Sequence, residues 1–268
     1  MNKLNILFII LIGLTINSCS NEDTTDIEIP QNEKKLIKIN MTDNYGEYEN
    51  QFIYDSNNNV IEINNEFTEF GETNSDLLKE VFSYENSLVT SGLAYRNGEL
   101  YLTYEFNYSN NQLVERISYT TNGTEDEKYE FNYTSNGEIN SFNYYVEEDL
   151  QQVINFTYNN DGNIIITEDG TNYSEIQYDI NPTPYDNFSY PNKIIFAQYN
   201  SNIINHICKN NVTNEIRTYN NNSSNEQVFN YLTTITYDSD NFPLSKTLVE
   251  TNSNNEQRTV RTISYEYE

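Results

Sequence analysis

The sequence predicts an all-β protein, a curled antiparallel β-meander built from repeated hairpins, whose sheet either stays open or closes into a barrel. Three observations predict this fold. A motif of an apolar residue, any residue and tyrosine recurs along the chain; apolar and polar residues alternate around it; and pairs such as Asn97–Gly98 separate the alternating segments. Two strands with one apolar face cannot bury that face alone, so successive hairpins have to add side by side.

The chain begins with the layout of an export signal. Lys3 supplies a positive charge, and the apolar run Ile6–Leu14 follows it. This run is about half of the roughly 20 apolar residues that a membrane-spanning helix needs. We therefore predict a signal peptide over residues 1–18.

The segment Ile16–Cys19 resembles the lipobox of bacterial lipoproteins, in which a signal peptidase cuts before a cysteine whose thiol then carries diacylglycerol. Asn17 departs from the small residue usual at its position. The resemblance implies a lipid anchor on Cys19, and ordinary cleavage leaving a free thiol is the alternative.

The residues after the cysteine, Ser20–Asp23, look like the acidic surface-export tag of Bacteroidota lipoproteins. That resemblance implies an exported outer-membrane lipoprotein exposed at the cell surface. No period is visible before the first strand, so we expect residues 19–35 to form an acidic flexible tether and residues 36–268 to form a single repeat domain.

Composition limits the partners. The chain has 14 Lys and Arg against 41 Asp and Glu, a net charge of −27, which argues against nucleic acid and anionic lipid and does not exclude cations or basic proteins. We expect a glycan or a protein as the ligand. With Cys19 acylated, Cys208 has no cysteine to pair with. We expect no cofactor.

The repeat itself is regular. Tyr84, Tyr108, Tyr133 and Tyr158 follow one another at intervals of 24 or 25 residues, which indicates internal repetition. Between the strands, four pairs are predicted to form type I′ turns because their residues tolerate positive φ angles: Asn97–Gly98, Asn122–Gly123, Asn136–Gly137 and Asp161–Gly162.

Three segments interrupt the repeated pattern of strands and turns. The prolines of Tyr178–Asn192 predict a loop that leaves the sheet, and residues 220–224 predict a hairpin tip. Ser75–Phe82 is predicted to hold one helical turn capped by Ser75.

Phe131–Gly137 looks like the YD repeats of RHS-type proteins, and Tyr178–Pro182 and Tyr237–Pro243 are similar to segments of Bacteroidota surface lipoproteins with short repeats. The resemblance covers roughly residues 36–268 and implies an architecture more than an activity. RHS proteins enclose toxin cargo, but this chain has too few repeats and no cargo domain, so that function is not carried over.

The sequence holds few clusters of residues that could bind a metal or catalyse a reaction. His206 and Cys208 would share one face of a strand, yet two ligands fall short of a zinc site, and ordinary strand residues are the simpler interpretation. Asp161, Asp238 and Asp240 are weak calcium candidates, because turn chemistry alone explains acids and amides at these positions.

Aromatic side chains offer the remaining candidate site. Rings that cannot all lie on one buried face could stack on sugars, or could instead pack under loops or across the second face of the sheet: Tyr101, Tyr144, Tyr145, Tyr185, Phe188 and Tyr190.

The sequence favours a non-catalytic, lipid-anchored binding or scaffold protein. The first alternative is a carbohydrate-binding accessory lipoprotein that presents surface tyrosines. The second is a glycan hydrolase with paired carboxylates drawn from acidic runs such as Glu125–Glu127 and Glu147–Asp149.

Overall fold

The computed structural model describes residues 34–197, 206–220 and 224–268, so the signal peptide, Cys19 and nearly all of the tether lie outside it. Lys34–Glu268 forms one compact unit. Its strands are β1 Leu36–Asp43, β2 Gly46–Tyr54, β3 Val60–Glu69, β4 Asp76–Glu85, β5 Leu88–Arg96, β6 Glu99–Ser109, β7 Gln112–Thr120, β8 Glu125–Tyr133, β9 Ile139–Val146, β10 Asp149–Tyr158, β11 Ile164–Asp169, β12 Asn172–Pro182, β13 Asn210–Tyr219, β14 Gln227–Tyr237, β15 Pro243–Thr251 and β16 Gln257–Tyr267, and the helix is α1 Tyr190–Ala197.

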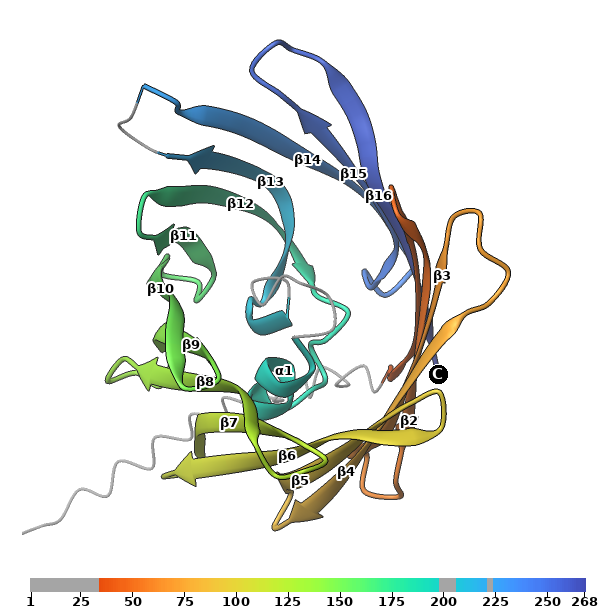
Figure 1. The fold of residues 1–268 in the computed structure, drawn as a ribbon. Helices are drawn as coiled ribbons and strands as arrows, with labels where there is room; N and C mark the ends of the chain where they lie inside the picture. The colour runs from red at the N-terminus through yellow and green to blue at the C-terminus, as the bar shows by residue number, and fades with distance from the viewer. Residues whose placement is uncertain (1–33, 198–205, 221–223) are drawn as a thin grey trace, which may run out of the picture. The chain divides into compact units, whose positions relative to one another are not determined.

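These strands form a closed antiparallel barrel (Figure 1) in which each strand pairs with its neighbours in sequence and β1 pairs with β16. The closing ladder runs from the pair Leu36 and Tyr267 to the pair Asp43 and Arg261. The predicted all-β meander of hairpins is confirmed, and the sheet closes.

The repeated motif lies in each even-numbered strand, and from β2 to β12 its apolar residue is in the core and its tyrosine packs against the core. The tyrosine sits at a register shift, as Tyr54 does opposite Val60. A bulge of this kind disturbs the ladder and leaves a carbonyl to be satisfied. The tyrosine of the following even strand satisfies it: Tyr84 donates its hydroxyl to the Val60 carbonyl at 2.7 Å.

The same bond recurs around the barrel and explains the sequence repeat. Equivalent hydroxyl-to-carbonyl bonds join Tyr54 to Leu36, Tyr133 to Leu113, Tyr158 to Ile139, Tyr178 to Ile164 and Tyr267 to Pro243. Five of these carbonyls belong to residues that are almost fully buried: Leu36, Val60, Leu113, Ile139 and Ile164. In these six places one hairpin is thus fastened to the preceding strand by a tyrosine, whereas Tyr237 donates to the carboxylate of Asp179 instead.

The turns follow two patterns, so the type I′ prediction is only partly right. Asn97 and Gly98 both have positive φ, 51° and 87°, as that turn requires. In the turns at Gly123, Gly137 and Gly162 only the glycine has positive φ. There the residue three positions earlier accepts the glycine N–H, as Thr134 does from Gly137 at 3.0 Å, which fits a type I turn followed by a left-handed residue.

The connection from β12 to β13 leaves the sheet, as its prolines predict, and Figure 1 shows its helix α1 within the ring of strands. We call the described residues of this connection, 183–197 and 206–209, the insert. Phe188 packs on Phe52 of β2, with ring centroids 5.8 Å apart, and Phe196 packs on Phe82 of β4 at 5.3 Å. The insert therefore fills the end of the barrel that carries the motif residues.

No helix among the described residues is long and apolar enough to cross a membrane.

Two local predictions are wrong. Ser75–Phe82 is not helical: β4 starts at Asp76, because Leu78, Glu80 and Phe82 alternate inward with an outward set at a period of two. His206 and Cys208 do not lie on a strand either. They end the insert, and both are buried.

Candidate functional site

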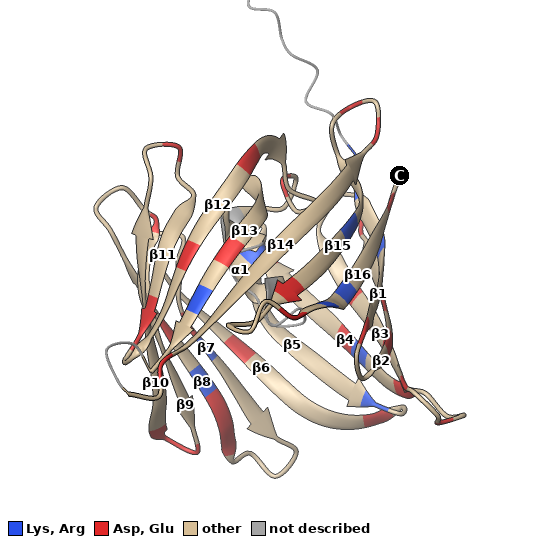
Figure 2. Cartoon of the chain, turned by 90° about the horizontal axis from the view of Figure 1, so that it is seen from above, with Lys and Arg blue, Asp and Glu red and all other residues tan. Residues whose placement is uncertain are grey.

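The outer face of the barrel carries polar side chains in the middle of its strands, with exposed apolar ones such as Leu93, Val153 and Leu232 among them. Figure 2 shows acidic and basic residues along the strands around the barrel as well as in the turns. Exposed or partly exposed positions that alternate with the buried ones carry Gln51, Asn64, Lys79, Glu105, Asn107, Glu130, Asn132, Asn155, Thr157, Glu175, Gln177, Thr234 and Thr236. A membrane-spanning barrel needs an apolar outer band about 25 Å tall, and Lys or Arg at its middle costs about 2–4 kcal/mol each. This outer face suits water.

The interior has two different halves. The half with the motif residues is packed with apolar side chains and the insert, whereas the half at the β5–β6 and β13–β14 turns carries charged pairs. There Arg217 binds Glu215 through two bonds of 2.7 and 2.9 Å and lies 4.7 Å from the ring centre of Tyr231. This second half is where the interior can meet a polar ligand.

A pocket of about 340 Å³ lies on the inner side of β2–β6 in that half. We call it the lumenal pocket, and it is lined by Tyr48, Asn50, Asn65, Glu66, Phe67, Asp76, Leu78, Arg96 and Tyr101. Tyr48 and Phe67 are opposite each other on β2 and β3, and their rings stack with centroids 4.5 Å apart. They give the pocket an aromatic wall.

An ion pair lies beside that wall. The Arg96 guanidinium donates from Nε and Nη2 to Asp76, and the Asn97 amide donates to the same carboxylate at 3.1 Å. The hydrogen bonds from Arg96 lower the pKa of Asp76 below its ordinary value. Arg96 also lies over Tyr101, 5.7 Å from the ring centre. The site thus holds a fixed pair of opposite charges.

Two amides occupy the next row of the same face. Asn50 and Asn65 are opposite each other on β2 and β3. Asn50 is buried, and both amide atoms of Asn65 are buried with no hydrogen-bond partner. A buried amide without partners costs roughly 1–3 kcal/mol, so Asn65 lowers the stability of the barrel unless something binds its amide.

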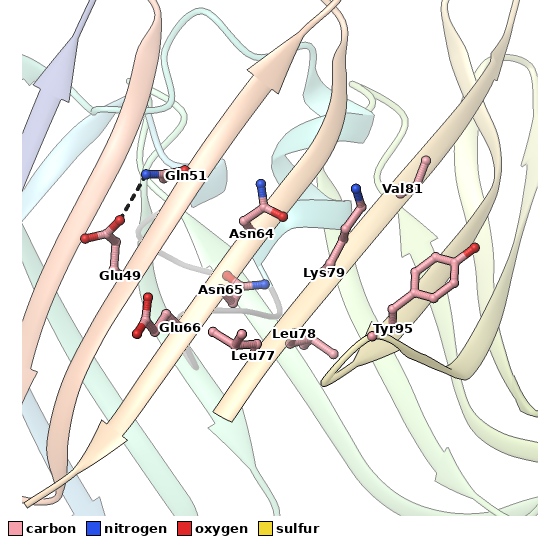
Figure 3. A pocket seen from close by; sticks show the side chains of 11 residues that line it. Glu49, Gln51, Asn64, Asn65, Glu66, Leu77, Leu78, Lys79, Val81 and Tyr95 are labelled. Atoms are coloured by element: carbon pink, nitrogen blue, oxygen red, sulfur yellow. Dashed lines mark hydrogen bonds between the residues drawn. The ribbon is translucent and has the colours of Figure 1, made fainter. Parts of the chain in front are cut away.

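A second hollow, of about 640 Å³, lies on the outer side of β2–β5 and shares Asn65, Glu66 and Leu78 with the lumenal pocket. Figure 3 shows Gln51, Asn64 and Lys79 extending from three neighbouring strands, with Gln51 donating to Glu49 at 3.0 Å. Lys79 forms an ion pair with Glu62 at 2.6 Å. Its polar side chains already bind one another, so this hollow makes a weaker candidate than the lumenal pocket.

The aromatic residues picked from the sequence do not converge. Tyr101 lies in the lumenal pocket and is 45% exposed. The Tyr144 ring packs at a tilt against Tyr129 and its hydroxyl donates to Glu127 at 2.7 Å, whereas Tyr145 lies on the opposite face of β9 and donates to Glu130 at 2.9 Å. These three rings form no common platform.

Two aromatic residues of the insert that were predicted as candidate ligand contacts are not exposed. Tyr185 and Phe188 are buried in the core, Tyr185 stacking on His206 with ring centres 3.8 Å apart. They pack inside because the insert turns into the barrel. Tyr190 is the first residue of α1.

The weak metal candidates lie apart. Asp161 is an exposed turn residue, whereas Asp238 and Asp240 both bind Lys34, at 2.5 and 2.6 Å. Within the part of the chain that the structure describes, no group of three His, Cys, Asp or Glu side chains could hold a metal ion. His206 and Cys208 serve the core: burial lowers the pKa of His206 to about 3 and raises that of Cys208 to about 11.

Sequence reasoning missed most of the lumenal pocket. Asn50 and Asn65 occupy positions whose neighbours two residues away, such as Phe52 and Ile63, are buried and apolar. A polar residue on the inward-facing half of an alternating strand is the signal that could have found them. The pairing of Tyr48 with Phe67 depends on the strand register and could not be predicted.

The barrel is similar to two solved porin-like proteins. One, from Bacteroides uniformis ATCC 8492, is 15% identical, with a TM-score of 0.56 over 87% of this chain and 98% of that one. The other, from Bacteroides vulgatus ATCC 8482, is 10% identical, with a TM-score of 0.45 over 88% of this chain and 99% of that one. No family model and no curated protein matches the chain. The first likeness establishes the fold.

Proposed function

We propose that the chain is an exported, non-catalytic binding protein, held at the outer membrane by a lipid on Cys19, with its barrel in water. The observation that carries the proposal is the polar outer face of a barrel whose one end is filled by its own insert. A barrel filled at one end is unsuited to conduction, and polar and charged side chains along the outer face are unsuited to lipid. The export-signal layout before Cys19 supplies the anchor.

The ion pair in the lumenal pocket makes Asp76 a poor general acid. A glycosidase needs a general acid whose pKa is raised, whereas Arg96 lowers the pKa of Asp76. The carboxylate is held as an anion and serves to position Arg96.

Metabolic labelling with an alkyne analogue of palmitate tests the anchor. We expect label on the wild-type chain and on Cys208→Ala, because the Cys208 thiol is buried with a raised pKa, and none on Cys19→Ala. Label that persists in Cys19→Ala would refute the lipid anchor. Recovery of labelled protein in the inner membrane would refute the outer-membrane location.

The second candidate is a carbohydrate-binding accessory protein. It is favoured by the position of Tyr101, which lies in the same pocket as an aromatic pair and two amides. Affinity electrophoresis in polysaccharide gels tests it: retardation that Tyr101→Ala abolishes supports this role, and equal migration with and without polysaccharide contradicts it.

A further inference from the structure

We propose that the lumenal pocket binds a short neutral saccharide, whose ring contacts the Tyr48–Phe67 pair and whose neighbouring hydroxyl groups bind the amide of Asn65. The proposal deepens the proposed function by naming a ligand class, and it depends on that function only in treating the protein as a binding protein. The lipid anchor is independent of it.

The amide of Asn65 selects for hydroxyl groups. Its Oδ1 accepts and its Nδ2 donates, and both atoms are buried without a partner, so a ligand reaches them when neighbouring side chains of the pocket move aside. Two adjacent hydroxyl groups satisfy both at once, since one can donate to Oδ1 while the other accepts from Nδ2. A phosphate or sulfate could accept from Nδ2 but would leave Oδ1 unsatisfied, and an apolar ligand would satisfy neither atom.

The aromatic wall selects for a ligand with an apolar face. Tyr48 and Phe67 stack next to the row of Asn50 and Asn65, so one ligand can contact the rings and the amides together. A sugar ring has C–H groups that pack on aromatic carbon and hydroxyl groups at its rim. Tyr101, on β6, adds a third ring at the edge of the pocket.

Charge selects for a neutral ligand. Asp76 and Arg96 neutralise each other through direct hydrogen bonds, and Glu66 adds a further carboxylate to the lining. An acidic sugar would therefore meet a pocket with a surplus of negative charge. The volume of about 340 Å³ is at the lower end of the range of about 300–1,000 Å³ for small-molecule pockets, which suits one or two sugar units.

Saturation-transfer NMR on the full-length chain tests the proposal, in a zwitterionic detergent without a sugar headgroup. The probes are cellobiose, maltose, lactose and N,N′-diacetylchitobiose, with sodium sulfate and glucuronic acid as competitors. We expect transfer to the ring protons of at least one disaccharide, with no loss on adding either competitor. Absence of transfer to all four, or displacement by sulfate, would overturn the proposal.

Asn65→Leu is the decisive variant, because it removes the amide while keeping an inward-facing side chain of similar size. We expect binding to weaken by about tenfold or more, while the urea midpoint stays the same or rises, since an unpartnered buried amide has been removed. The matched control is Asn155→Leu on the exposed outer face of β10, which should bind as the wild type does. Equal binding by Asn65→Leu and the wild type would overturn the assignment.

Discussion

The tyrosine of the repeated motif is the residue that fastens one hairpin to the strand before it. Its ring faces the interior, and its hydroxyl group binds a carbonyl at a bulge, as Tyr133 binds Leu113 at 2.6 Å. Burial raises the pKa of the motif tyrosines, Tyr54 and Tyr84 among them, so these hydroxyl groups stay protonated and can donate. The abundance of tyrosine is thus in large part structural.

Tyr133→Phe should lower the free energy of unfolding by roughly 1–2 kcal/mol, because it leaves the carbonyl of a fully buried residue without its partner. Urea unfolding followed by far-ultraviolet circular dichroism measures the change. Tyr145→Phe is the control, since that hydroxyl group binds Glu130 on the outer face, where water can replace it. An equal decrease in the free energy of unfolding in the two variants would show that the motif hydrogen bond stabilises the barrel no more than the bond on the outer face.

His206 should make stability depend on pH. It stacks on Tyr185, and burial together with Lys246 and Lys193 lowers its pKa from 6.5 to about 3. The folded state therefore favours the neutral ring, so its contribution is complete above about pH 6.5 and is lost as pH falls toward 3.

The variant His206→Phe keeps the stacking and removes the proton site. Between about pH 6 and pH 4 the stability of the wild type should fall faster than that of the variant, by about 1.4 kcal/mol per pH unit. Unfolding curves at several pH values measure both. Parallel pH profiles would mean that His206 is not buried in its neutral form.

The insert is the element that most changes the barrel. Its prolines predicted that the chain leaves the sheet between β12 and β13, and this is what the structure shows. The sequence could not predict that the insert packs inside the barrel, because this packing depends on contacts such as that of Phe196 with Phe82, which is more than a hundred residues away in sequence. The same limit applies to the lumenal pocket, whose aromatic pair exists only in one strand register.

Phe196→Ala should destabilise the barrel by about 3–5 kcal/mol, because it opens a cavity where the insert meets β4. Phe70→Ala is the control: this ring is 55% exposed in the turn after β3, and its loss should cost less than about 0.5 kcal/mol. Thermal unfolding compares the two. A small effect of Phe196→Ala would mean that the insert does not pack inside the barrel.

At the scale of the whole molecule, local patterns predicted the meander but left its closure open. Alternation and turn residues act within one hairpin, whereas closure requires that strand number, tilt and stagger agree around the whole sheet. The ladder between β1 and β16 joins Ile39 to Tyr265, residues from opposite ends of the domain. Closure removes both sheet edges, so no strand is left with a row of unpaired backbone groups.

The behaviour of the barrel without its anchor shows whether it stands in water or spans the membrane. A chain lacking residues 1–19 should remain monodisperse in buffer without detergent, should not sediment with phospholipid vesicles and should produce no conductance across a planar bilayer, because its outer face is polar and its insert fills one end. Aggregation that only detergent reverses, or insertion with conductance, would contradict the account and show that the barrel itself spans the membrane.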